Sequence, residues 1–146
     1  MIVRNIYLLL LSLLGIGAIF GGGVLIISPF GEALGMPLSM LSNSPFSNFL
    51  IPGVILFVVL GVTPLWVVWA LLKRPHYQLA ESINFFSDMF WAWSFSIYVA
   101  FALIIWIQIE MYYLQSVHWS HILYMLWAVL IIFFALIPQV RGLYKK

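Results

Sequence analysis

Four long apolar stretches, almost free of charge, constrain this sequence more than any other feature. They run from Ile6 to Ile27, from Phe49 to Leu72, from about Met89 to Tyr113 and from about His121 to Val140. A helix needs about 20 apolar residues to cross the hydrocarbon core of a bilayer. Because the stretches are continuously apolar and do not alternate with polar residues, they predict membrane helices and argue against the strands of a membrane barrel.

The composition argues against a soluble domain. Of the 146 residues, 65% are hydrophobic and 7% are charged, whereas a soluble domain has roughly a quarter of its residues charged. Six Lys and Arg residues and a net charge of +2 are too few for the dense basic patch of a nucleic-acid-binding surface. The absence of cysteine excludes disulfides, thiolate nucleophiles and cysteine-ligated metals. No cofactor motif is present, so we expect no cofactor.

The distribution of cations predicts the orientation of the chain. The cations are Arg4, Lys73, Arg74, Arg141, Lys145 and Lys146. If each apolar stretch crosses the membrane once, all six lie on one side, and the positive-inside rule assigns that side to the cytoplasm. We therefore predict an all-α fold for residues 1–146. It would be a single integral membrane domain, an antiparallel up-and-down bundle of four transmembrane helices with both termini cytoplasmic.

The connecting segments have different characters. Three prolines break the segment Ser28–Asn48 into short pieces, which predicts either a helical turn on the outer membrane surface or a hydrophobic loop packed over the bundle. The segment Tyr77–Phe86 is expected to form a short interfacial helix. The connection Leu114–Ser120 is so short that the third and fourth helices should be antiparallel neighbours.

Small residues follow a regular spacing in the first stretch. Gly17 and Gly21 are four residues apart, as are Ala18 and Gly22. In lipid, this spacing lets two helix backbones approach closely. It predicts packing within the bundle. The alternatives are a dimer face or a bend beside a ligand.

Glu110 is the only acidic residue inside a predicted membrane helix, about one turn from its outer end. A carboxylate there costs several kcal/mol unless it is paired, protonated or hydrated. Gln108 is near it in sequence, and His118 and His121 lie across the short connection. We expect Glu110 to face inward with a polar neighbour. It could be a hydrogen-bonded structural residue, a proton- or ion-binding site, or a metal ligand together with both histidines.

Several segments resemble uncharacterised small four-span bacterial membrane proteins. They are SPFSNFLIPG at 44–53 followed by Gly61, WAWSFSIY at 91–98, ALIIWI at 102–107 and IPQVR at 137–141. The resemblance implies a multi-pass protein of the cell inner membrane. It implies no activity and assigns no catalytic residues.

Three functional hypotheses remain open. The first, which we favour, is a non-enzymatic bundle that binds a membrane partner or a lipophilic ligand, as an accessory subunit for example. The second is a small proton- or ion-coupled transporter centred on Glu110. The third is a metal-dependent membrane enzyme that uses Glu110, His118 and His121. In each case the lipid bilayer surrounds the protein, and a second copy or a larger membrane complex is the expected partner.

Overall fold

The computed structural model describes residues 1–146 and is entirely helical. Helices hold 75% of the residues, and there are no strands. Four helical segments are long and apolar enough to span a membrane, namely Ile2–Ile27, Leu50–Lys73, Trp91–Leu114 and Trp119–Leu136. The predicted helical fold with four candidate membrane-spanning helices is therefore confirmed.

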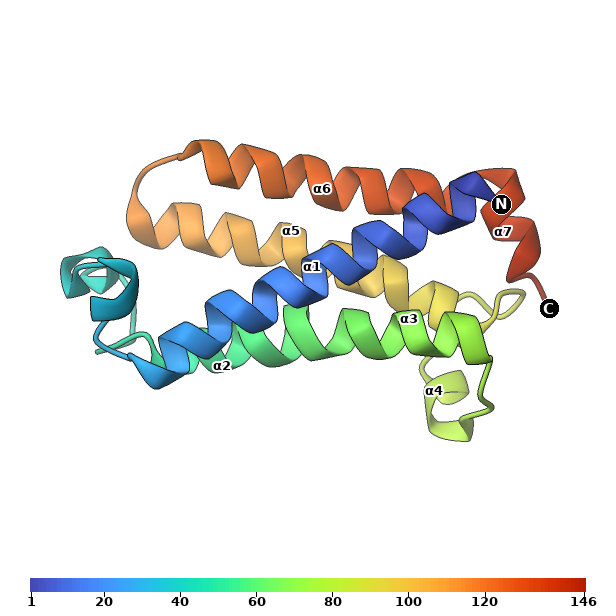
Figure 1. Ribbon diagram of the computed structural model, residues 1–146, viewed down its shortest axis with the longest axis horizontal. Coiled ribbons are helices and arrows are strands. Elements are labelled where there is room, and N and C mark those ends of the chain that lie inside the picture. Colours follow the sequence, from blue (N-terminus) through green and yellow to red (C-terminus); the bar gives the residue numbers. More distant parts are fainter.

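Figure 1 shows how these segments divide into elements. The first and second spans are α1 (Ile2–Ile27), α2 (Leu50–Phe57), the π-helical turn η3 (Val58–Val62) and α3 (Thr63–Lys73). The later elements are α4 (Gln78–Ser82), α5 (Trp91–Leu114), α6 (Trp119–Leu136) and α7 (Pro138–Leu143). Two 3-10 turns, η1 (Glu32–Leu34) and η2 (Leu38–Leu41), lie between α1 and α2.

Helix α1 organises the bundle. It crosses diagonally over the other helices and contacts α2, η3, α3, α6 and α7 (Figure 1). Helix α5 packs against α6 on one side and α3 on the other. Both chain termini, α4 and α7 lie at one end of the molecule, and the segment containing η1 and η2 lies at the other end with the connection between α5 and α6 (Figure 1).

The ends of the helices differ from those of the predicted spans in all four cases, by only one residue at each end of the second. Helix α1 begins at Ile2, not Ile6, and α5 continues to Leu114. Helix α6 ends at Leu136 instead of continuing to Val140. The reason is Pro138, which disfavours helical backbone at the residue before it; Ile137 accordingly adopts φ −57° and ψ 132°. The chain resumes as α7 in a new direction.

Tryptophan indoles link neighbouring helices. The Trp93 indole N–H donates to the carbonyl of Ala135 at 2.9 Å and so joins α5 to α6. Trp127 donates to the carbonyl of Leu10 at 3.0 Å and joins α6 to α1. Trp93 is buried, and a buried indole needs such a partner. These bonds link three of the helices that surround the candidate site.

The closest backbone approach on α1 involves Gly22 and Gly15. A Cβ on Gly22 would lie 2.7 Å from the carbonyl oxygen of Gly53, and one on Gly15 would lie 2.9 Å from that of Gly61. Gly15 and Gly22 are about two turns apart and share one face of α1. Gly17 has nothing within 4 Å of such a Cβ, and Gly21 meets only a Leu56 methyl at 3.8 Å. The expected close packing thus occurs at Gly22, beside the buried Ala18, but not at Gly17 or Gly21.

Candidate functional site

The turn between α5 and α6 brings Glu110 and His121 together. The Nε2 atom of His121 lies 3.3 Å from an Oε atom of Glu110. The His121 side chain is 4% exposed, whereas that of Glu110 is 34% exposed. The carboxyl group therefore has a polar neighbour and also an accessible surface.

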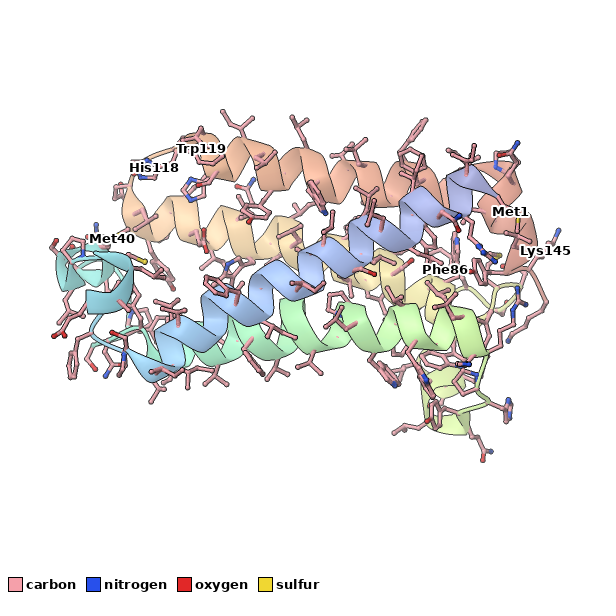
Figure 2. All side chains as sticks on the ribbon, in the orientation of Figure 1. Met1, Met40, Phe86, His118, Trp119 and Lys145 are labelled. Carbon is pink, nitrogen blue, oxygen red and sulfur yellow. The ribbon has the colours of Figure 1, made fainter.

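His118 orients His121 but forms no ion pair of its own with Glu110. The backbone N–H of His118 donates to Nδ1 of His121 at 3.1 Å, so in a neutral imidazole the ring proton is on Nε2, the atom nearest Glu110. The Nε2 atom of His118 lies 3.2 Å from the Ser116 hydroxyl. Figure 2 shows His118 and Trp119 at this turn.

The metal hypothesis needed Glu110, His118 and His121 to converge. The structure contains no group of three His, Cys, Asp or Glu side chains placed to hold a metal ion. The geometric reason is that Nδ1 of His121 already accepts the His118 amide, and His118 itself is directed to Ser116. Gln108, which was also a candidate, is exposed and does not line either of the cavities that adjoin Glu110.

A first cavity, of about 170 Å³, lies between α1, α5, α6 and the second span. Its polar lining comes from Glu110, Ser120, His121 and Tyr124. The small residues of α1 line the opposite part of the wall: they are Gly17, Ala18 and Gly21. Because Gly17 and Gly21 have no close neighbours, their missing side chains leave this space open.

A second cavity, of about 140 Å³, lies beneath the segment that connects α1 and α2. Eleven of its 13 lining residues are hydrophobic. Those contributed by the connecting segment are Met36, Met40, Leu41, Phe46 and Phe49. The segment forms the helical turns η1 and η2, and η2 also contacts α5, so the structure combines features of the two alternatives, a short helical turn and a loop packed over the bundle.

Glu110 lines both cavities, together with Leu56 and Trp106. No Lys or Arg lines either cavity. The site is therefore one carboxyl group and one imidazole at the boundary between a partly polar chamber and an almost wholly apolar one. Such a combination of apolar walls and a few polar groups is typical of sites for small molecules.

Leu56 and the methionines of the connecting segment were not predicted as site residues from the sequence. The position of Trp106 beside Glu110 was predictable, since it precedes Glu110 by four residues on the same helix. The positions of Met36 and Met40 were not predictable, because nothing in their local sequence shows how the segment folds back over the bundle.

No family model, curated protein or solved structure matches the chain. The resemblance to four-span bacterial proteins therefore stays a prediction, and the function must be argued from the geometry of the site.

Proposed function

We propose that this protein is a non-enzymatic membrane protein that binds a small lipophilic molecule carrying one polar group. The observation that carries the proposal is the position of Glu110 at the wall shared by the two cavities. The apolar part of the molecule would occupy the cavity beneath the connecting segment. Its polar group would extend into the first cavity, which Gly17 also lines, and would meet Glu110 and His121 there.

The proposed setting is an antiparallel bundle whose termini face the cytoplasm. Both termini and α4 lie at one end of the molecule (Figure 1), and all six cations belong to the segments near that end. The positive-inside rule then favours a cytoplasmic location for it. The resemblance noted in the sequence favours the cell inner membrane. The outward-facing sides of the four long helices would contact lipid or a second copy of the chain.

Filling the first cavity tests the proposal. Gly17→Leu adds a side chain where a Cβ meets nothing within 4 Å, and Gly142→Leu makes the same change in open space on α7, away from both cavities. Three probes of similar shape serve as ligands: benzyltrimethylammonium, neopentylbenzene and phenylmethanesulfonate. Binding is measured by equilibrium dialysis against nanodiscs that contain the protein, with empty nanodiscs as the control for partitioning into lipid.

We expect at least one probe to bind the wild-type chain and Gly142→Leu equally, and to bind Gly17→Leu at least about tenfold more weakly, a difference of roughly 1.4 kcal/mol. Thermal unfolding of both variants should match the wild type, because a Cβ added at either position meets no atom within 4 Å. If Gly17→Leu weakens the binding of no probe, the two cavities are not a ligand-binding site.

The 3.3 Å contact between His121 and Glu110 favours one second candidate, proton-coupled transport. An imidazole beside a carboxyl group can pass a proton. With only four spans, such a transporter would act as a dimer. Uptake of a bound probe into proteoliposomes, driven by a pH gradient and lost in Glu110→Gln, would distinguish transport from binding alone.

A further inference from the structure

We infer that the molecule bound at Glu110 is a lipophilic cation, an inference that rests on the proposed binding function. Its positive group would lie against the Glu110 carboxylate, and its apolar part would fill the cavity beneath the connecting segment. Three features of the site support this: its charge, its aromatic rings and the nature of its apolar roof.

An ionised Glu110 would lack a positive counterpart within the chain. No Lys or Arg lines either cavity. At the other end of the molecule, Lys146 pairs with Glu81 and Arg141 lies near Asp88. Arg74 donates to the carbonyl of Leu143. An ionised carboxylate among apolar walls is costly without an opposite charge, and a cationic ligand would supply it.

His121 does not supply that charge while its ring is neutral. Its Nδ1 accepts the His118 amide proton at 3.1 Å, and an Nδ1 that accepts a hydrogen bond carries no proton. The ring can therefore offer Glu110 one N–H but no full positive charge. An anionic ligand would face the carboxylate directly, so the charge pattern disfavours it.

Aromatic rings line the two cavities that meet at Glu110. Trp106 borders both cavities, Tyr124 borders the first and Tyr113 the second. Aromatic faces attract cations, with the strongest effect where water is excluded. Rings from two helices therefore add to the attraction that the carboxylate exerts.

The roof of the second cavity suits an apolar group of variable shape. Met36 and Met40 line it from the connecting segment, and Figure 2 places Met40 at the same end of the molecule as His118. Methionine side chains are unbranched and polarisable, so they adapt to different apolar ligands. The site would therefore select for charge more strictly than for shape.

Two of the three probes test this directly. Benzyltrimethylammonium and neopentylbenzene differ only in nitrogen or carbon at the branch point, so they have the same shape and differ in charge. On the wild-type chain in nanodiscs we expect the cation to bind at least about tenfold more tightly than its neutral counterpart, after correction with empty nanodiscs. This comparison needs no variant and does not depend on whether a variant folds.

Glu110→Gln should then weaken binding of the cation at least about tenfold and leave binding of neopentylbenzene unchanged. Glu32→Gln is the matched control, since Glu32 is an exposed acid in the connecting segment at the same end of the molecule and lines neither cavity. It should bind all probes as the wild type does.

The outcomes separate the two proposals. If neopentylbenzene or the sulfonate binds as tightly as the cation and Gly17→Leu weakens that binding, the site exists but does not select cations, and the present inference fails alone. The inference also fails if Glu110→Gln retains the preference for the cation. If Gly17→Leu weakens the binding of no probe, both proposals fail.

Discussion

Gly22 lies where α1 and α2 cross with their backbones in contact. A Cβ there would meet the Gly53 carbonyl oxygen and the Phe57 amide nitrogen, both at 2.7 Å. Backbone atoms cannot move aside as a flexible side chain can. Gly22→Ala should therefore lower the free energy of unfolding by about 1–3 kcal/mol, as overpacking does, even though alanine favours helix over glycine by about 1 kcal/mol. Thermal unfolding in detergent measures the change.

Gly17→Ala provides the control on the same helix. Its Cβ would meet nothing within 4 Å, so only the gain in helix propensity applies and the protein should be as stable as the wild type or slightly more stable. Equal destabilisation by both substitutions would mean that Gly17 packs against something that the isolated chain lacks, such as a second copy.

At the scale of elements, the C-terminal tail after α7 closes over the connection between α3 and α5. The Phe90 amide donates to the carbonyl of Tyr144 at 2.7 Å, and the Lys146 amide donates to that of Asp88 at 2.9 Å. The Lys146 ammonium lies 2.6 Å from the Glu81 carboxylate. The tail thus joins α7 to the segment that contains α4.

The contact between the C-terminal tail and the segment that contains α4 should depend on pH through Glu81. Burial raises the pKa of its carboxyl group, but the hydrogen bond and positive charge of Lys146, together with hydrogen bonds from Asn84 and the Trp91 backbone, outweigh burial and hold the pKa below its usual value of 4.5. A lowered pKa stabilises the folded state above pH 4.5, and this stabilisation is lost as the pH falls through the lowered value. Both side chains are partly exposed, so the effect should be at most about 1 kcal/mol.

We therefore expect the Lys146 and Phe90 amides of the wild type to lose protection from hydrogen exchange as the pH falls below 4.5. Glu81→Gln should show reduced protection already at neutral pH and little further change on acidification. Comparing the two chains at each pH removes the intrinsic pH dependence of exchange. Identical protection in both chains at every pH would show that the ion pair does not hold the tail.

The elements show how far the sequence alone could lead. Four candidate membrane helices were predictable because a bilayer demands long apolar stretches whatever they pack against. The end of α6 was predictable in principle, since Pro138 disfavours helix at Ile137. The π-helical turn Val58–Val62 directly precedes Thr63 and Pro64; a proline removes a backbone donor and bends a helix, so Pro64 indicated a distortion here but not its π-helical form.

The candidate site was predictable only in part, because much of it depends on how segments distant in the sequence pack together. The short connection between α5 and α6 had to bring Glu110 near the histidines, and it brings His121 to 3.3 Å. Which histidine would face the carboxyl group depended on the capping of α6 by His118. The second cavity depends on tertiary folding of the segment from Ser28 to Asn48, which local sequence does not determine.

At the scale of the whole molecule, the segregation of charge predicts which end faces the cytoplasm. The chain has no cysteine, so a single introduced thiol reports its own location. Ser42→Cys lies in the segment between α1 and α2, and Ser82→Cys lies at the end of α4; both serines are exposed. In intact cells, a membrane-impermeant maleimide should label Ser42→Cys at once and Ser82→Cys only after the membrane is permeabilised, because the positive-inside rule places the cation-rich end in the cytoplasm.

The same substitution at both sites makes each variant the control for the other. Labelling of Ser82→Cys alone would invert the proposed topology, and labelling of both in intact cells would show that the two ends do not lie on opposite sides of a membrane.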